Sequence, residues 1–274
     1  MIGGPVDVMA GIAADLPAMM MTRMLDVPHA DYPRFRQWAT AFMLSAPLTP
    51  EQRSASNDEM LAYFVERVQT RAQSGGSAED FVSMLLQTKQ EQVELTVEEV
   101  IRFCFTLVVA GAETTTGLIG NLFWIAATQP DAYAQVQHDP SLIDVFVEET
   151  LRIAGPPQRL FRIATQDTRL GEQTIRKDDW VAAFFAAANH DPDVWEAPTE
   201  FQLNRPSPRA HFSFGHGIHQ CLGAMLVRLE ARAIMQALCA QCGKVEVAPG
   251  GFSRQSATQL SYALDTCNVV LQPC

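Results

Sequence analysis

Residues 214–223 read FGHGIHQCLG, with three glycines and two histidines around one cysteine. Gly215, Gly217 and Gly223 allow tight turns and a close approach of the backbone to a ligand. Cys221 stands where an apolar stripe begins, formed by Leu222, Leu226, Leu229 and Ala233, which we expect to anchor a helix. Backbone N–H groups and the positive end of a helix dipole stabilise a thiolate. The pattern predicts an anionic Cys221 that acts as a nucleophile or a metal ligand.

Three interpretations of this cysteine compete. A structural thiol at a helix start leaves the flanking glycines unexplained. Zinc held by His216, His219 and Cys221 uses suitable ligand types, but the spacing is unfamiliar for zinc, and the Cys239-x-x-Cys242 pair has no second pair to match it. The third interpretation is axial ligation of haem iron by the thiolate.

The segment resembles the haem-binding loop of the cytochrome P-450 family, F-G-x-G-x-H-x-C-x-G in soluble bacterial members, at every fixed position. The resemblance implies a heme b cofactor (iron protoporphyrin IX) with Cys221 as the axial ligand. It also implies that Phe214 packs beside the sulfur and that His219 contacts a haem propionate. Gly215 and Gly223 complete the implied cofactor-binding loop.

A second motif lies upstream, where residues 110–115 read AGAETT. Taken alone, these residues fit a kinked core helix with one solvated acid, since a threonine hydroxyl can bond back to the carbonyl one turn earlier and distort the helix. The segment is similar to the oxygen-activating A-G-x-[DE]-T-T of the same family. That similarity implies catalytic roles for Glu113 and Thr114.

Three arginines and a glutamate complete the resemblance. Glu149 and Arg152 lie at i, i+3 on one helical face, a spacing usually found in surface ion pairs of little energetic worth. In the family this pair is buried and structural, with a third partner in P-x-R-F. This chain has Pro-Thr-Glu-Phe at 198–201, so Arg205 is expected as the substitute. Arg162 resembles the strand arginine that pairs with a haem propionate, the alternative being a solvent-facing strand residue.

Composition narrows the class of protein. The net charge of −11 argues against nucleic-acid binding. The apolar runs 103–112 and 180–188 are shorter than the roughly 20 residues that a bilayer requires. The first residues show no signal-peptide pattern, so we expect a cytoplasmic protein with no membrane partner. The six cysteines are too sparse for a disulfide scaffold and are expected to be reduced, with those other than Cys221 in the core.

Helical signals dominate the chain. Capping boxes at Thr49 and Thr96 begin two helices, the first ending at Gly75-Gly76 and the second running to about Thr128. Further helices are expected from Pro140 to about Gly155 and from Cys221 to about Gln241. Strands are expected around Gly171 and at 245–247 and 269–271. We therefore predict a mainly α, cytochrome P-450-like fold with small β-sheets, a single domain over 1–274 that lacks the family's N-terminal third.

The resemblance implies a haem-thiolate monooxygenase that inserts one oxygen atom from O2 into a C–H bond. Electrons would come from a separate ferredoxin or flavodoxin with its reductase. The expected pocket residues are mostly apolar and predict a hydrophobic small-molecule substrate: Phe105, Val108, Val109, Gln158 to Leu160, and Leu260. The alternatives are a peroxide-driven peroxygenase and a haem-binding fragment without efficient turnover.

Overall fold

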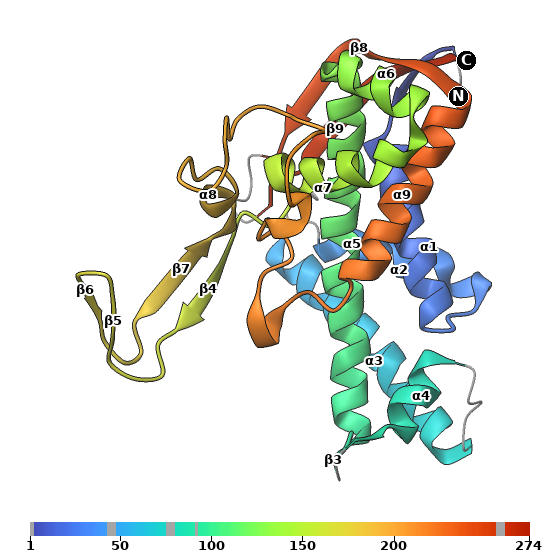
Figure 1. Cartoon of the computed structure of the whole chain (residues 1–274). Helices are drawn as coiled ribbons and strands as arrows, with labels where there is room; N and C mark the ends of the chain where they lie inside the picture. The colour runs from blue at the N-terminus through green and yellow to red at the C-terminus, as the bar shows by residue number, and fades with distance from the viewer. Residues whose placement is uncertain (1–2, 43–47, 75–79, 91–92, 256–260) are drawn as a thin grey trace. The chain divides into compact units, whose positions relative to one another are not determined.

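The computed structural model describes residues 3–42, 48–74, 80–90, 93–255 and 261–274 (Figure 1). Met9–Thr116 forms one compact unit, and Gly117–Cys274 together with Met1–Val8 forms another. The expected helix stop at Gly75-Gly76 and the expected pocket residue Leu260 lie outside the described residues.

The unit Met9–Thr116 is helical, and its core is an aromatic cluster between α2 and α3. Phe35 lies edge-on to Phe64 with ring centroids 6.5 Å apart, and Trp38 lies 5.1 Å from Tyr63. Arg34 covers the Trp38 and Tyr63 rings at 5.1 and 5.5 Å. The elements of this unit are η1 (Met9–Ala13), α1 (Ala14–Met24), η2 (His29–Asp31), α2 (Tyr32–Phe42), α3 (Pro50–Ser74), α4 (Phe81–Gln87), β2 (Lys89–Gln90), β3 (Val93–Glu94) and the first part of α5 (Val97–Thr128).

Both predicted capping boxes are present. The Thr49 amide donates to Gln52 Oε1 at 2.8 Å, and the Gln52 amide donates to Thr49 Oγ1 at 3.3 Å. The Thr96 amide donates to Glu99 Oε2 at 2.8 Å, and the Glu99 amide donates to Thr96 Oγ1 at 3.2 Å. These reciprocal bonds satisfy N–H groups that have no partner inside the helix. They fix the starts of α3 and α5, and α5 runs for the expected 32 residues.

The other unit contains the second part of α5 and the remaining helices (Figure 1). Pro130 begins a separate helix, α6, which the sequence analysis did not predict. Proline suits the first helical position, where its missing N–H would have no intrahelical partner. The helices that follow α5 are α6 (Pro130–His138), η3 (Pro140–Leu142), α7 (Ile143–Ala154), α8 (Phe185–Asn189), η4 (Pro208–Ala210), η5 (Gly217–His219) and α9 (Ala224–Gln241).

Helix α9 buries a different face from the one predicted. Ala231, Ile234, Met235 and Leu238 are buried, and the helix packs against α7. The expected anchor stripe is instead largely outside the core, with Leu222 72% and Leu229 60% exposed. The prediction was wrong because the apolar residues of α9 surround most of the helix, so periodicity alone could not select the buried side.

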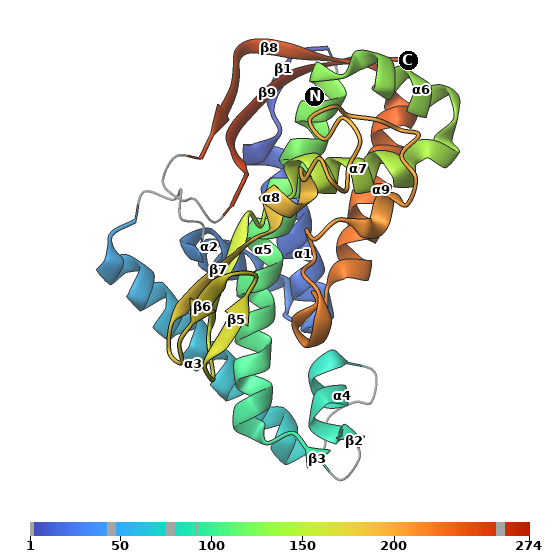
Figure 2. The same ribbon diagram turned by 60° about the vertical axis from the view of Figure 1, so that its left-hand side comes forward.

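Three small sheets complete this unit. The largest has the order β1–β9–β8 and joins β1 (Pro5–Asp7) to the long antiparallel pair β8 (Cys242–Arg254) and β9 (Leu264–Pro273), as Figure 2 shows. The expected strands at 245–247 and 269–271 are only the middle of this pair. β4 (Arg159–Ile163) pairs with β7 (Trp180–Phe184), and β5 (Thr168–Leu170) pairs with β6 (Gln173–Ile175) across a turn where Gly171 has φ +58°.

A buried amide connects three segments of this unit. Asn121 on α5 donates at 2.7 Å to the carbonyls of Ala154 and Tyr262. Its oxygen accepts at 2.6 Å from Arg254, whose guanidinium lies over the Trp124 and Tyr262 rings at 4.2 and 3.7 Å. Because buried polar groups are costly when unpaired, Asn121 holds α5, the end of α7 and the strand region in one arrangement.

Helix α5 is, by length and composition alone, the one helix among the described residues that could cross a bilayer. The expectation from uninterrupted apolar runs did not include this helix. Glu113 and several threonines interrupt its apolar sequence, although the helix as a whole remains apolar. Half of its apolar window is buried inside the protein. Core helices of soluble proteins pass the same test, so the finding is weak evidence for a membrane span.

Glu230 on α9 generates a test of the pH dependence of stability. Its side chain is 5% exposed, its Oε1 has no hydrogen-bond partner among the described residues, and burial raises the pKa of this carboxyl from 4.5 to about 7. A group whose folded-state pKa is raised contributes stability that is complete below pH 4.5 and lost as the pH rises through about 7. We expect Glu230→Gln to exceed the parent in the free energy of unfolding, measured with urea, by up to about 3 kcal/mol at pH 8, and to match it near pH 4. Glu172→Gln, at an exposed turn, should stay within about 0.5 kcal/mol at both pH values; an equal effect of Glu230→Gln at both would contradict the assignment.

Candidate functional site

Cys221 lies on an exposed loop just before α9. Its amide donates to the Phe214 carbonyl at 2.8 Å, and the Gly215 amide donates to the Phe212 carbonyl at 2.8 Å. Gly215 and Gly217 have φ of +68° and +76°, a region that side chains with a Cβ rarely adopt. These turns bring Cys221 back beside Phe214 and leave its thiol exposed.

The loop surrounds this sulfur with space and with apolar surface. A Cβ built on Gly223 would lie 3.9 Å from the Cys221 Sγ, so the residue that caps α9 adds no bulk there. Ile218 and Leu222, close to the cysteine in sequence, are 97% and 72% exposed. His219 is also exposed. The loop thus presents a thiol, an imidazole and apolar side chains together.

Phe214 is held from the side of α9. The Arg228 guanidinium lies 4.5 Å above its ring, and the His211 ring is 6.0 Å away. Arg228 and His211 also contact one carboxylate, since Arg228 Nε lies 2.5 Å from Glu148 Oε1 and His211 Nε2 lies 2.9 Å from Glu148 Oε2. Burial raises the pKa of Glu148, but the bonds from His211 and Arg228 outweigh burial and hold that pKa at about 2. An ionised Glu148 therefore ties the start of α9 to α7.

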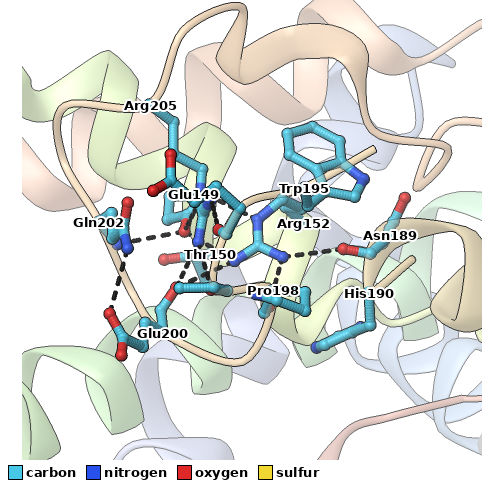
Figure 3. Close-up of polar contacts among 12 residues, drawn as sticks. Glu149, Thr150, Arg152, Asn189, His190, Trp195, Pro198, Glu200, Gln202 and Arg205 are labelled. Atoms are coloured by element: carbon cyan, nitrogen blue, oxygen red, sulfur yellow. Dashed lines mark hydrogen bonds and ion pairs between the residues drawn. The ribbon is translucent and has the colours of Figure 1, made fainter. Parts of the chain in front are cut away.

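A buried cluster of three charged residues lies on the other side of α7 (Figure 3). Arg152 donates to both oxygens of Glu149 at 2.8 Å, and Arg205 Nε donates to Glu149 Oε1 at 2.7 Å. All three side chains are at most 3% exposed. The structure thus brings together the three residues that the sequence analysis paired, with Arg205 in the third position.

The two arginines also hold the loop that follows α8. Arg152 donates to the carbonyls of Asn189, Pro198 and Glu200 at 2.7–3.0 Å. Arg205 donates to the carbonyls of Glu196, Ala197 and Glu200 at 2.6–2.9 Å. The Arg152 guanidinium also lies 5.2 Å from the Trp195 ring. These carbonyls lie at the end of α8 and in the loop that follows it, where no next helical turn or strand supplies a donor.

Asn189 connects this charged cluster to the cysteine loop. Its backbone carbonyl binds Arg152, its side-chain oxygen accepts from the Phe212 amide at 2.7 Å, and its Nδ2 donates to Ser213 Oγ at 2.9 Å. Ser213 Oγ in turn donates to the Leu151 carbonyl at 2.6 Å. A Cβ on Gly155 would lie 2.5 Å from both of these oxygens, so only glycine fits there. A continuous hydrogen-bonded path therefore runs from Glu149 to the residue before Phe214.

Arg162 projects from β4, where it pairs in register with Val181. Its side chain is exposed, and Nη1 donates at 2.9 Å to the carbonyl of the preceding residue, Phe161. The residue thus keeps a cation at the surface of a two-stranded ribbon. Its pairing with a propionate stays a prediction.

Glu113 and Thr114 lie on α5 in the unit Met9–Thr116. Thr114 Oγ1 donates to the Ala110 carbonyl at 2.7 Å, the back-bond expected from the sequence, but α5 remains one uninterrupted helix. Burial raises the pKa of Glu113, an effect partly opposed by Arg53. A raised pKa favours the protonated form of this carboxyl, which makes it a candidate proton donor.

The zinc alternative lacks a ligand arrangement. Within the part of the chain that the structure describes, no three His, Cys, Asp or Glu side chains gather in a group that could hold a metal ion. His216, His219 and Cys221 share one loop without meeting at a common point. The haem interpretation needs only one protein ligand to the iron.

The family model for Cytochrome P450 matches residues 20–250. The chain belongs to this family.

The relatives agree with this membership. The chain is 34% identical to the putative cytochrome P450 YjiB of Bacillus subtilis over 85% of its length, and 35% identical to the cytochrome P450 monooxygenase PikC of Streptomyces venezuelae over 90%. It covers 60% and 59% of those two proteins, so it spans about three fifths of their length. The structure of CYP109E1 from Bacillus megaterium in complex with corticosterone superposes with a TM-score of 0.90 at 29% identity, covering 97% of this chain and 72% of that one. The predicted P450 fold is confirmed.

The sequence analysis missed the second charged cluster of this P450 chain. His211 and Arg228, the partners of Glu148, lie 63 and 80 residues after it in the sequence. The only signal in the sequence was the second acid, Glu148, directly before Glu149. Adjacent helical residues point about 100° apart, so two such acids that are both buried face different surroundings. Glu148 and Glu149 therefore need separate partners: Arg228 contacts Glu148, and Arg152 and Arg205 contact Glu149.

Removing Arg205 tests how much the charged cluster contributes to stability. Arg205→Met would leave Glu149 without one of its two guanidiniums and the Glu196 carbonyl without its donor, and would remove one of the two donors to each of the Ala197 and Glu200 carbonyls. We expect a loss of about 3–5 kcal/mol in the free energy of unfolding, measured with urea, because breaking a buried ion pair leaves uncompensated polar groups. Arg209→Met is the matched control, since Arg209 is 66% exposed and only approaches Glu148 at 3.4 Å; it should cost less than about 1 kcal/mol. Equal losses for the two variants would show that the buried cluster contributes no more to the free energy of unfolding than an exposed ion pair.

Proposed function

We propose that this chain is the haem-binding part of a cytochrome P450 monooxygenase that inserts one oxygen atom from O2 into a C–H bond of a hydrophobic small molecule. The observation that carries the proposal is the exposed Cys221 thiol, presented by a glycine-turned loop at the start of α9. Because the chain spans only part of its relatives, the activity, the substrate and the partners all belong to the proposal.

The donor set around Cys221 suits haem. A thiolate is an established axial ligand of haem iron, and the exposed apolar side chains Ile218 and Leu222 suit the apolar face of a porphyrin. Carboxylates of the cofactor require cations or donors, and Arg162 and His219 are both exposed. We assign Cys221 as the ligand, Arg162 and His219 as propionate partners, and Phe214 as the ring beside the sulfur.

When bound, haem supplies the oxygen activation and the electron transfer that no protein side chain can perform. The chain orients and protects the ligand. Arg228 and Glu148 hold Phe214, and Asn189 anchors the residues just before it, so the loop keeps its turns. These contacts fix where the Cys221 sulfur lies.

Proton handling is assigned to α5. The Thr114 hydroxyl is already oriented by its bond to the Ala110 carbonyl, and burial raises the pKa of Glu113, which favours its protonated form as a proton donor. We propose that Glu113 delivers protons and that the Thr114 hydroxyl relays them during oxygen cleavage. An intact acid–alcohol pair favours use of O2 with reducing equivalents over direct use of peroxide.

The electron donor is proposed to be a separate ferredoxin or flavodoxin with its reductase. Product formed with a reductase system, compared with product formed with hydrogen peroxide alone, separates the monooxygenase from a peroxygenase. Product in neither assay supports the alternative of a haem-binding chain without turnover. The hydrophobic substrate class and a cytoplasmic location stay predictions.

Replacing Cys221 tests the iron ligand. Cys221→Ser removes the thiolate, so we expect the thiolate-type spectrum of the reduced, carbon monoxide-bound protein to disappear. Cys274→Ser is the matched control, since it removes another exposed thiol and should leave the spectrum unchanged. A thiolate-type spectrum that survives Cys221→Ser would mean that another residue binds the iron.

Replacing Thr114 tests the proton relay. Without its hydroxyl, Thr114→Ala should keep haem and substrate binding but lose roughly tenfold or more of its product per electron, with the difference appearing as hydrogen peroxide. The control is Thr106→Ala on the same helix, where the hydroxyl makes the same back-bond, to the Arg102 carbonyl at 2.8 Å. Unchanged coupling in Thr114→Ala would remove this residue from the mechanism.

A further inference from the structure

Three cysteines converge where α9 ends: Cys239 and Cys242, which are three residues apart, and the distant Cys274. Cys239 lies in the last turn of α9, Cys242 is the first residue of β8, and Cys274 directly follows β9. The β8–β9 register pairs Cys242 with Pro273, which places Cys274 beside them. The Cys274 thiol lies 3.7 Å from the Cys239 carbonyl oxygen and donates to it.

Tyr133 on α6 fixes the inner part of this cluster. Its hydroxyl donates to the carbonyls of Cys242 and Leu238 at 2.8 and 3.2 Å, and it also contacts the Cys239 thiol. Gln137 Nε2 donates to the Cys242 carbonyl at 2.7 Å as well. The turn from α9 into β8 is therefore held rigidly from α6.

The three thiols differ in accessibility. Cys242 is 3% exposed, Cys239 is half-buried and Cys274 is exposed. Burial raises the pKa values of both Cys239 and Cys242. The expectation that the cysteines other than Cys221 are core residues is thus wrong for Cys274. A dissolved oxidant reaches this thiol first.

A metal ion does not explain the cluster, because no metal-binding group of three His, Cys, Asp or Glu side chains occurs among the residues the structure describes. A disulfide requires only two suitably placed thiols. Disulfide-bonded residues have Cα atoms about 4.4–6.8 Å apart. The 3.7 Å contact between the Cys274 thiol and the Cys239 carbonyl makes these two residues direct neighbours. Cys239, being half-buried, is the better partner for Cys274 than the enclosed Cys242.

We propose that Cys239 and Cys274 form an oxidation site, where hydrogen peroxide converts the two thiols into an intramolecular disulfide. In the first step the Cys274 sulfur attacks one peroxide oxygen, the O–O bond breaks, and a sulfenic acid and water form. In the second step the Cys239 sulfur attacks the Cys274 sulfur, the S–O bond breaks, and a second water leaves. With hydrogen peroxide, two thiols are oxidised, one peroxide is reduced, and the products are one disulfide and two waters.

The bond would join the end of α9 to the end of β9. Between them lie 34 residues that contain all of β8 and β9, so closing this loop restricts the unfolded chain. We expect the oxidised protein to unfold at a higher urea concentration than the reduced protein. The haem ligand Cys221 precedes α9 and takes no part in this chemistry.

Peptide mapping tests the proposal. The reduced full chain is exposed to hydrogen peroxide, its remaining thiols are alkylated under denaturing conditions, and it is digested with trypsin. Cleavage after Arg232, Lys244 and Arg254 gives peptide 233–244 with Cys239 and Cys242, and peptide 255–274 with Cys267 and Cys274. We expect these two peptides to be linked, lighter than their sum by two hydrogen atoms and separable by reductant.

Single serine variants assign the link to its cysteines. It should be absent in Cys239→Ser and Cys274→Ser, and should persist in Cys242→Ser and Cys267→Ser, all four being checked by gel filtration and circular dichroism for a native fold. A link that persists in Cys239→Ser overturns the assignment. Disulfide-bonded dimers, or Cys274 oxidised without a link, likewise overturn it.

Discussion

The carboxylate of Glu149 is the constraint on which the ordered loops of this protein depend. A buried negative charge is tolerated only with nearby cations, and Arg152 and Arg205 supply them at 2.7–2.8 Å. Once these guanidiniums are fixed, their remaining N–H groups orient the loop between α8 and η4, and through Asn189 they reach the segment that precedes Phe214. The position of the cysteine loop is therefore determined from inside the protein, by charge compensation, rather than by the loop's own flexible residues.

Much of the fold could be predicted from local signals. The capping boxes at Thr49 and Thr96 predicted the first residues of two helices. A capping box depends only on hydrogen bonds within four consecutive residues, so the sequence shows it directly. The face that α9 buries could not be predicted, since Leu222 and Leu229 are as apolar as the residues that pack against α7. The full lengths of β8 and β9 were also missed, because strand pairing between residues 242 and 273 is a long-range choice that local propensity does not encode.

The candidate site divides in the same way. Cys221 and the Glu149–Arg152 pair stand in short motifs, and the family resemblance led to Arg205 as the third partner of that pair. The bonds from Arg228 and His211 to Glu148 could not be read from sequence, because these residues belong to no motif and meet only when α7 and α9 pack. The same holds for Cys239 and Cys274, which a register between two strands brings together.

The four tryptophans give the two compact units separate optical reporters. Trp38 is the only one in Met9–Thr116 and is fully buried, whereas Trp124, Trp180 and Trp195 belong to the other unit. Trp180 is 71% exposed, while Trp124 lies under the Arg254 guanidinium at 4.2 Å. Emission from a protein that retains only Trp38 would therefore report the aromatic core between α2 and α3 alone. Comparing its denaturation curve with that of the parent would reveal whether the two units unfold together or in succession.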